Sequence, residues 1–359
     1  MAVLKINLPK IQKNIATLDE IFSRNNVGWS LVVKILGNNT EILKAILSDD
    51  SLNNFHSVAG SHWQELRMVK EINPEITTMF IKPPAIRNAG NVVRYADISL
   101  NTSKYTIEVL NEAARKQKRT HKVIIMIEMG ELREGIHREG LVEFYDSIFQ
   151  LSNIEVVGLG TNLGCMHGLR PTYDKLIQLV LYQQLLESKF NRSLPIISGA
   201  SSITIPFLLK KTIPRGINHF RIGEAAFLGT TPLTNRPLKH LNTDCFEFEA
   251  HIVELSLKDT TPDGEITEAA IGHTSDFKPT QEKSYKALLD FGILDVDAHN
   301  LFPIDESVRF FGNSSDLTVY DLGDNAHGYK EGDVITFKVN YMAVAKLMTS
   351  RYIEKSIIR

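Results

Sequence analysis

Short apolar runs alternate with amphipathic stretches along most of the chain. Between Trp29 and Gly229 one unit recurs: an apolar run, a polar turn, and a stretch whose apolar positions have helical spacing. The apolar runs are rich in β-branched residues and almost continuously hydrophobic, which is typical of parallel strands covered by helices. The predicted strands are 30–34, 55–59, 78–81, 98–101, 123–128, 156–162, 195–199 and 220–223.

Helical periodicity fills the intervals between these runs. The clearest helices are predicted over 41–48, 105–118, 173–189 and 203–211, and another over 8–23 would precede the first strand. Strands that alternate with helices in this way are typical of α/β folds. Eight such alternations within roughly 200 residues favour a (β/α)₈ TIM-type barrel over an open doubly wound sheet.

The pattern changes after Gly229. Residues 230–244 are rich in Thr, Pro, Asn and Leu and are predicted to form a linker. Beyond them, alternating polar and apolar positions predict strands over 246–255, 285–291, 308–311, 317–321 and 333–339. We therefore expect a barrel domain over 8–235 and a β-rich C-terminal domain over 236–359, joined by residues 1–7.

Composition and charge exclude several classes of protein. The chain of 359 residues is 43% hydrophobic and 23% charged, and its net charge of −2 offers no broad attraction for nucleic acid or anionic membranes. No apolar run approaches the ~20 residues of a membrane span, and the first ten residues do not resemble a signal peptide. The two cysteines, Cys165 and Cys245, form no C-x-x-C pair. We expect a soluble cytoplasmic protein.

Candidate chemistry lies at the predicted strand ends, because active sites of such barrels gather there. Lys34 ends the first predicted strand. It is either solvated or a desolvated amine that can form a Schiff base. Arg133 lies between Gly130 and Gly135 after the fifth strand, where it is either a solvated loop residue or a donor to an oxyanion.

The last two strand ends carry hydroxyl and basic groups. Ser201 and Ser202 follow the seventh strand, where hydroxyls suit a phosphate group but also an ordinary helix cap. Arg221 lies on an otherwise apolar strand and needs a buried partner. The histidines near barrel loops, His137 and His167, have no companions at metal-ligand spacing, so no metal site is predicted.

Taken in order, these residues resemble the alanine racemase-like pyridoxal-phosphate (PLP) enzymes of fold type III, and most closely their ornithine racemase branch. The resemblance runs through nearly the whole chain and implies PLP as cofactor. It implies these roles: Lys34 as the Schiff-base lysine, Arg133 facing the phenolic oxygen, Asn162 where a histidine usually packs on the ring, Ser202 binding phosphate beside Ser201 in place of a usual asparagine, Arg221 on the pyridine nitrogen, and Gly223 and Glu224 donating backbone N–H groups to phosphate.

The resemblance also implies a homodimer with shared active sites. Residues 312–316, including Asp316, are similar to the segment that reaches into the partner's site, and Tyr341 to the tyrosine that closes over the phosphate. One departure stands out, because Ile293 occupies the position of the catalytic tyrosine. Cys165 is the leading candidate for the missing second base, although a small buried apolar role fits it equally well. Asp295 and Asp316 from the partner chain are the alternatives.

The predicted function is that of a PLP-dependent amino-acid racemase, working through an external aldimine and α-proton transfer on ornithine or another basic amino acid. Related decarboxylases place a glutamate on the ring nitrogen, where this chain has Arg221. Non-catalytic PLP homeostasis proteins resemble the barrel alone. A metal-assisted threonine aldolase would need a His/Asp ligand set that the sequence does not offer.

Overall fold

The computed structural model describes residues 1–48, 55–232, 236–265, 272–275 and 281–359. The chain divides into two compact units. The barrel unit comprises Gln12–Lys34 and Asn38–Asn242, and the β unit comprises Met1–Ile11, Ile35–Gly37 and Thr243–Arg359. The predicted linker 230–244 includes residues 233–235, which lie outside the described residues.

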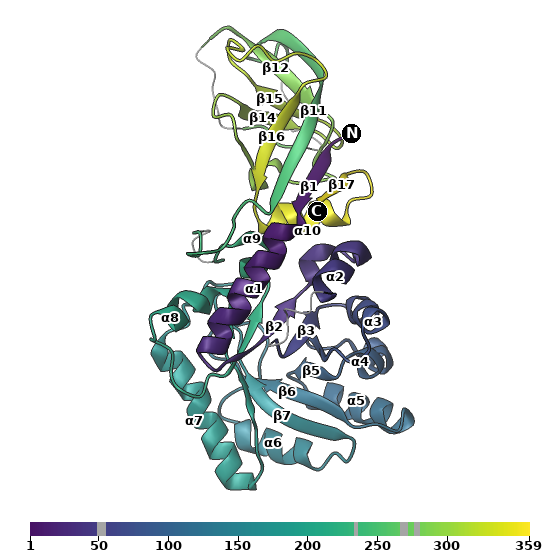
Figure 1. Ribbon diagram of the computed structural model, residues 1–359, viewed down its shortest axis with the longest axis vertical. Coiled ribbons are helices and arrows are strands. Elements are labelled where there is room, and N and C mark those ends of the chain that lie inside the picture. The colour runs from purple at the N-terminus through teal and green to yellow at the C-terminus, as the bar shows by residue number, and fades with distance from the viewer. Residues whose placement is uncertain (49–54, 233–235, 266–271, 276–280) are drawn as a thin grey trace. The chain divides into compact units, whose positions relative to one another are not determined.

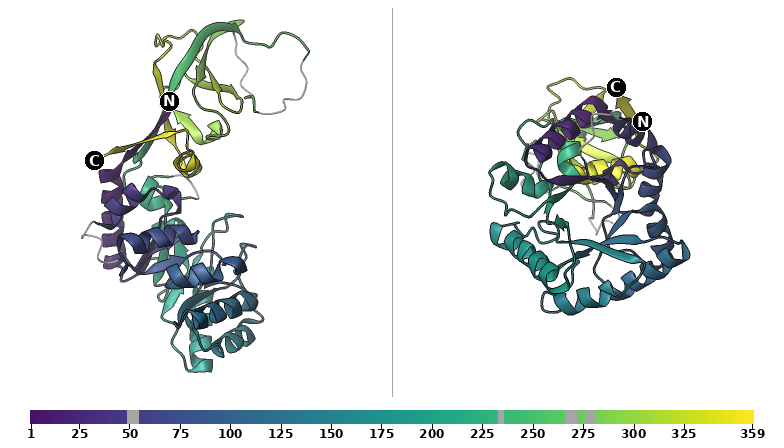
Figure 2. Two further views of the ribbon diagram at one scale, coloured as in Figure 1. Left: turned by 90° about the vertical axis from the view of Figure 1, so that its right-hand side faces the viewer. Right: turned by 60° about the horizontal axis from the view of Figure 1, so that its bottom comes forward.

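The barrel unit contains a parallel sheet in the order β8-β7-β6-β5-β4-β3-β2-β10-β9. Only Gly199 separates β8 from β9, so the pairing of β9 with β10 closes the sheet, and helices surround it (Figure 2, right). The predicted TIM-type barrel is therefore confirmed. Its strands are β2 (Gly28–Val32), β3 (Ser57–Gly60), β4 (Thr78–Phe80), β5 (Ile98–Asn101), β6 (His121–Met126), β7 (Ile154–Gly160), β8 (Ile196–Ser198), β9 (Ala200–Ser201) and β10 (His219–Ile222).

Helix starts follow the polar residues that precede them. The side chains of Asn39, Ser103 and Thr172 accept backbone N–H groups at the starts of α2, α5 and α7, which satisfies donors that a helix leaves unpaired. The helices are α1 (Leu8–Arg24), α2 (Thr40–Leu47), α3 (Trp63–Ile72), α4 (Ala89–Tyr95), α5 (Lys104–Lys116), α6 (Leu141–Phe149), α7 (Tyr173–Phe190), α8 (Ile205–Leu209) and α9 (Glu224–Leu228), with 3₁₀ turns η1 (Lys34–Leu36), η2 (Ile86–Asn88) and η3 (Ser202–Thr204) (Figure 1).

The two faces of β2 show how strand alternation directs side chains. Trp29 is fully buried against Phe22 of α1, whose ring also packs against Phe220 of β10, and the Trp29 Nε1 donates to Asp19 Oδ1 at 2.8 Å. Because successive residues of a strand point to opposite faces, Ser30 points to the barrel interior. There it lies opposite Ser57 of β3 and Arg221 of β10 in the strand register.

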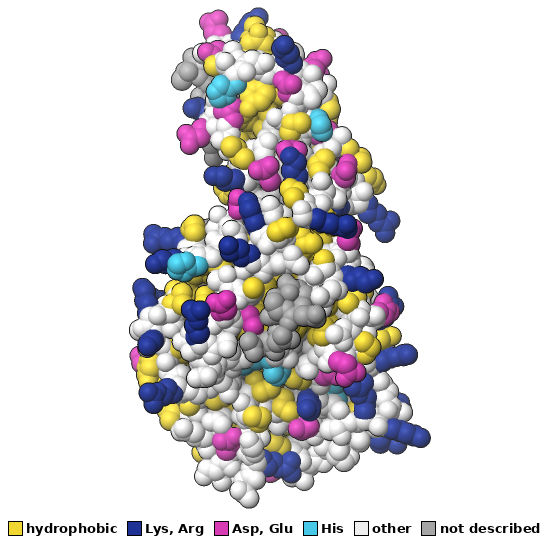
Figure 3. Space-filling model, viewed as in Figure 1, with side chains coloured by type: hydrophobic (Ala, Val, Ile, Leu, Met, Phe, Trp, Pro, Cys, Tyr) yellow, Lys and Arg dark blue, Asp and Glu magenta, His cyan; other side chains and the backbone are white. Residues whose placement is uncertain are grey.

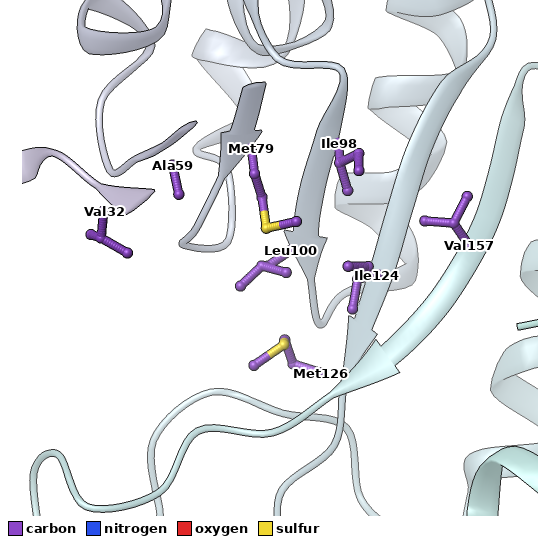
Figure 4. Close-up of a cluster of buried hydrophobic side chains, with 8 residues drawn as sticks. All are labelled: Val32, Ala59, Met79, Ile98, Leu100, Ile124, Met126 and Val157. Carbon is purple, nitrogen blue, oxygen red and sulfur yellow. The ribbon is translucent and has the colours of Figure 1, made fainter. Parts of the chain in front are cut away.

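The other side of the interior is apolar. A buried cluster combines side chains from β4, β5 and β6 with neighbours on both sides (Figure 4). Leu100 pairs with Ile124 in the register, and both are inaccessible or nearly so. The cluster consists of Val32, Ala59, Met79, Ile98, Leu100, Ile124, Met126 and Val157.

The β unit is a mainly antiparallel sheet in the order β13-β16-β11-β12-β15-β14, with β1 pairing with both β11 and β17. This confirms the predicted β-rich C-terminal domain. Its core includes the rings of Phe248, Phe291 and Phe337. Its elements are β1 (Val3–Asn7), β11 (Phe246–Asp259), β12 (Lys283–Leu289), η4 (Ala298–Asn300), β13 (Leu301–Pro303), β14 (Arg309–Asn313), β15 (Thr318–Asp321), β16 (Val334–Val339), α10 (Tyr341–Thr349) and β17 (Glu354–Ile358).

Basic and acidic side chains are interspersed on the face shown in Figure 3, in keeping with a net charge of −2. Across the described ranges, no helix is long and apolar enough to cross a membrane.

Candidate active site

Lys34 lies directly after the first barrel strand. The strand was predicted to run to Lys34, but β2 ends at Val32 and Lys34 opens the turn η1. The reason is local: the N–H of Val33 still bonds to Ala59 O at 2.9 Å, and beyond that bond the chain turns away from the sheet. The Lys34 side chain is exposed, at the carboxyl end of the barrel, while Val32 and Val33 are buried.

Arg221 is buried inside the barrel mouth, with 9% of its surface exposed. Its Nη1 donates to the Ser198 carbonyl at 2.8 Å and to the Ser198 hydroxyl, and its Nη2 donates to Thr161 O at 2.8 Å. Within the described residues these bonds use three of the five N–H groups of a guanidinium, which leaves Nε–H and one Nη2–H. Burial lowers the pKa of Arg221 to about 10, so it stays cationic at neutral pH.

The predicted phosphate-binding residues come together at the ends of β9 and β10. Ser202 Oγ accepts the N–H of Ala225 at 3.2 Å, which ties the start of η3 to the start of α9. Gly223 and Glu224 therefore lie beside Ser202. The Glu224 side chain accepts from Thr230 Oγ1 at 2.9 Å, and burial raises its pKa.

Arg133 is the centre of a cluster formed by the loops after β6 and β7. Its Nε and Nη2 form an ion pair with both carboxylate oxygens of Glu134, and its Nη1 contacts Cys165 Sγ at 2.6 Å. The Asn162 amide, with its oxygen turned toward Arg133, accepts from Nη1 at 2.7 Å and from Nη2 at 2.6 Å. The structure thus brings together Arg133, Asn162 and Cys165, three residues that the sequence predicted separately.

Glu131 holds the loop that carries Cys165, and sequence reasoning missed it. Its buried carboxylate accepts backbone N–H groups from Gly164 (3.0 Å), Cys165 (2.9 Å), His167 (2.8 Å) and Leu169 (3.1 Å). Burial by itself would raise the pKa of Glu131, but these four donors hold the pKa below its usual value. The sequence feature that could have indicated Glu131 is its position, as an acidic residue, between Gly130 and Gly135.

Backbone conformation explains why these loops contain glycine. At Gly164 φ is +69°, and a Cβ there would lie 2.1 Å from Ile203 Cδ1. At Gly135 φ is +151°, and a Cβ would lie 2.2 Å from the backbone nitrogen of Glu128. Leu132 also has a positive φ, +56°, although it carries a side chain. Such strain in a non-glycine residue concentrates at functional loops.

The β unit brings together residues 312–316, which were predicted to reach a partner's site, and the segment around Ile293, the position of the family's catalytic tyrosine. The N–H groups of Ile293 and Leu294 bond to Ser314 O (3.0 Å) and Ser315 O (3.2 Å). Asp316 is exposed, whereas Asp295 is buried and accepts from Ser350 Oγ at 2.9 Å. Tyr341 is half-buried and opens α10, a helix that the sequence analysis did not predict.

The barrel mouth has the functional groups that PLP requires. The Lys34 amine is exposed after β2. The buried Arg221 keeps two N–H groups that bond to none of the described residues, which suits an unprotonated ring nitrogen, and Arg133 offers a second cation. The Ser202 hydroxyl and the backbone beside it suit a phosphate. The residues present therefore fit the cofactor.

Solved structures share this architecture along the whole chain. Alanine racemase from Bartonella henselae, with covalently bound pyridoxal phosphate, superimposes with a TM-score of 0.72 at 16% identity, and the match covers 99% of both chains. At this identity the likeness shows the fold.

Two curated relatives match in sequence over nearly their full length. Ornithine racemase from Acetoanaerobium sticklandii is 35% identical over 359 residues, with 99% of both chains covered. Lysine racemase from Thermotoga maritima is 31% identical over 358 residues, covering 98% of this chain and 97% of the relative. The model of the alanine racemase N-terminal domain matches residues 6–231. The chain belongs to the alanine racemase family.

Proposed function

We propose that the protein is a PLP-dependent racemase that interconverts L- and D-amino acids, and that its substrate is ornithine or another basic amino acid. The observation that carries the proposal is Arg221, a buried permanent cation held by Ser198 and Thr161 with two N–H groups to spare. The two full-length relatives named for basic amino acids support the substrate class.

The proposed cofactor-binding residues divide by the group that each would hold. Lys34 carries the cofactor covalently, Arg221 donates to its ring nitrogen, and Arg133 with Asn162 lies toward its phenolic oxygen. Ser202, with the backbone of Gly223 and Glu224, holds the phosphate, and Tyr341 covers it. When bound, PLP supplies the electron sink that makes an α-proton of an amino acid removable.

Racemisation by two bases places one base on each face of the substrate's α-carbon. We assign one face to the Lys34 amine and the other to the Cys165 thiol. Arg133 Nη1 lies against that thiol, and an adjacent cation is the setting in which a cysteine acts as a base. Asp316 of the partner subunit is the alternative. Asp295 suits the role poorly, because its carboxylate is buried and bonded to Ser350.

The decisive experiment is a racemisation assay on L- and D-ornithine, lysine, alanine and serine, with chiral separation of the products. We expect turnover of the basic amino acids in both directions. Borohydride reduction should attach the cofactor to a peptide containing Lys34. Cys165→Ser should lose racemisation in both directions while retaining exchange of the α-hydrogen of the enantiomer that Lys34 serves. Near-wild-type racemisation by Cys165→Ser would exclude the thiol.

A homodimer with shared sites can be tested by complementation. Lys34→Ala and Asp316→Ala protomers are each expected to be inactive, and mixing them should restore one intact site per heterodimer. Heterodimers that form without activity would contradict a shared site. The cytoplasm is the compartment we propose.

A decarboxylase of the same fold is the second candidate. Related decarboxylases have a glutamate that keeps the ring nitrogen protonated. This chain has Arg221 at that position, which disfavours the decarboxylase. The same assays distinguish it: a decarboxylase would release carbon dioxide and an amine from L-ornithine, with no D-enantiomer.

A further inference from the structure

We propose that His219 is a positioning residue for Arg221, at the centre of a directed hydrogen-bond relay inside the barrel. The inference rests on the proposed function for its catalytic consequence. The relay runs from Arg221 through Ser198 to His219 Nδ1 (2.9 Å), from His219 Nε2 to Ser30 (2.9 Å), from Ser30 to Ser57 (2.6 Å), and from Ser57 to His56 Nδ1 (3.1 Å).

The direction of the relay follows from its first member. A guanidinium can only donate, so the Ser198 hydroxyl oxygen must accept from Arg221. In the described part of the chain, the other contact of that hydroxyl is His219 Nδ1, which therefore receives its proton. His219 then carries its own proton on Nε2 and donates to Ser30. The Ser30 hydroxyl then donates to Ser57 Oγ, and the Ser57 hydroxyl donates to His56 Nδ1.

Burial keeps His219 neutral, as this arrangement requires. The side chain is 2% exposed, and burial, together with the nearby His56 and Arg221, lowers its pKa well below the usual value. A neutral imidazole accepts at one nitrogen and donates at the other. His219 can therefore accept from Ser198 and donate to Ser30. An imidazolium donates at both nitrogens and could not accept from Ser198.

The relay holds Arg221 in one orientation. With its proton directed to His219, the Ser198 hydroxyl presents a lone pair to Arg221 Nη1, while Ser198 O and Thr161 O hold two further N–H groups. The planar guanidinium is then held from one edge, and Nε–H and one Nη2–H stay available. If His219 is removed, the Ser198 hydroxyl can rotate and this support is loosened.

The first test is nuclear magnetic resonance of the purified holoenzyme with ¹⁵N-labelled histidine. The missing signal in His219→Asn assigns His219. We expect the neutral tautomer with its proton on Nε2 throughout the range from about pH 6 to 9. An Nδ1–H tautomer, or an imidazolium in that range, would overturn the relay. This measurement uses the native protein, so it does not depend on the folding of a disruptive variant or on catalysis.

The second test is the partition between racemisation and transamination, in which the substrate's amino group passes to PLP and leaves a 2-oxo acid. Arg221 donates to the ring nitrogen and so keeps it unprotonated, which should suppress transamination. His219→Leu should weaken the charge-assisted bond between Arg221 and Ser198 and raise the 2-oxo acid formed per racemisation by roughly tenfold. His219→Asn keeps an acceptor facing Ser198 and should restore most of the wild-type ratio. An unchanged ratio in folded His219→Leu would contradict the proposal.

His121 provides a matched control. It is as buried as His219, bonds to a serine (Ser99) at 2.7 Å, and its pKa is lowered by burial to about 4. Ser99 pairs with Phe80, which packs against α4, so this histidine lies outside the barrel interior. His121→Leu should keep the wild-type product ratio. Absence of racemisation in the wild-type protein would contradict the proposed function and leave the tautomer result standing.

Discussion

The two halves of the barrel interior differ in how they are filled. On the side of β4, β5 and β6, apolar side chains such as Met79, Leu100 and Ile124 interlock in one buried cluster. On the side of β10, β2 and β3, the interior holds Ser30, Ser57 and their hydrogen-bonded partners. One half is stabilised by contact area, and the other by a chain of satisfied polar groups.

The two halves also differ in which elements carry the polar groups at the barrel mouth. On the polar half they come from strands or from the residues just after them, as with Arg221 on β10 and Lys34 after β2. On the apolar half they come from loops: Arg133 follows β6 and Cys165 follows β7. The loops need their own support, which Glu131 provides with four accepted N–H groups.

The largest expected effect comes from comparing two lysines that each lie two residues after a strand. Lys34 follows β2 of the polar half, and Lys82 follows β4 of the apolar half. Lys34→Ala should lower kcat/KM by roughly 10³-fold or more and abolish the yellow colour, because the Schiff-base amine is lost. Both side chains are exposed, so both variants are expected to fold.

Lys82→Ala is the control and should keep wild-type activity and colour. Equal losses in the two variants, or an undiminished yellow cofactor in Lys34→Ala, would contradict the assignment of Lys34.

The next effect is on stability and should be larger in the apolar half than in the polar half. Leu100→Ala removes a side chain that is 2% exposed and leaves a cavity, which should lower the free energy of unfolding by about 3 kcal/mol. Ser57→Ala removes one hydroxyl from the relay and should cost about 1 kcal/mol. Urea unfolding measures both. A larger loss for Ser57→Ala would show that the polar half carries the stability.

Sequence patterns predicted the strands well because both halves bury their side chains. The range of β5 was predicted to the residue, since Ile98 and Leu100 alternate with buried polar residues in a short run bounded by turns. The strand that contains Ser198 was predicted over 195–199, where the structure has β8, but the short strand β9 that follows Gly199 was not predicted. The short helix α10 was missed because its start depends on one capping residue, Asn340.

Candidate site residues were predictable where a strand fixed their position. Arg221 stood out as a charge on an apolar strand, and its partners are backbone carbonyls and a serine, which no sequence spacing reveals. The only signal for Glu131 was its place in a glycine-flanked loop, since its role depends on how that loop and residues 164–169 fold onto each other. The same holds for the pairing of Ser30 with His219.

A third prediction concerns the loop support on the apolar half. Glu131→Gln replaces two accepting oxygens by one oxygen and an amide that faces backbone donors, so at least one N–H group loses its partner. We expect kcat/KM to fall about tenfold to a hundredfold, with faster amide hydrogen exchange across residues 164–169. Glu139→Gln, an exposed change shortly after the same loop, should have neither effect. Normal exchange with full activity would show that the loop holds its shape without Glu131.

The smallest expected effect is the pH dependence of stability that buried histidines introduce. In the folded protein the pKa of His121 is lowered to about 4, and that of His219 is lowered well below the usual 6.5, in both cases mainly by burial. Below pH 6.5 the unfolded chain therefore binds protons that the folded chain cannot, and stability is lost as the pH falls. Each histidine contributes at most about 1.4 kcal/mol per pH unit. Above pH 6.5 both states are neutral at these positions, and the contribution vanishes.

Urea unfolding between pH 7.5 and 5, a range above the usual titration of carboxylates, isolates this effect. The wild-type protein should lose stability steadily below pH 6.5, and His219→Asn should lose it with a shallower slope, because one of the buried imidazoles is gone. His137→Asn removes an exposed histidine and should keep the wild-type slope. If the slope of His219→Asn equalled that of the wild type, His219 would have to take up its proton in the folded state. A neutral His219 would then not connect Ser198 to Ser30, and the hydrogen-bonded chain that distinguishes the polar half from the apolar half would be contradicted at its central residue.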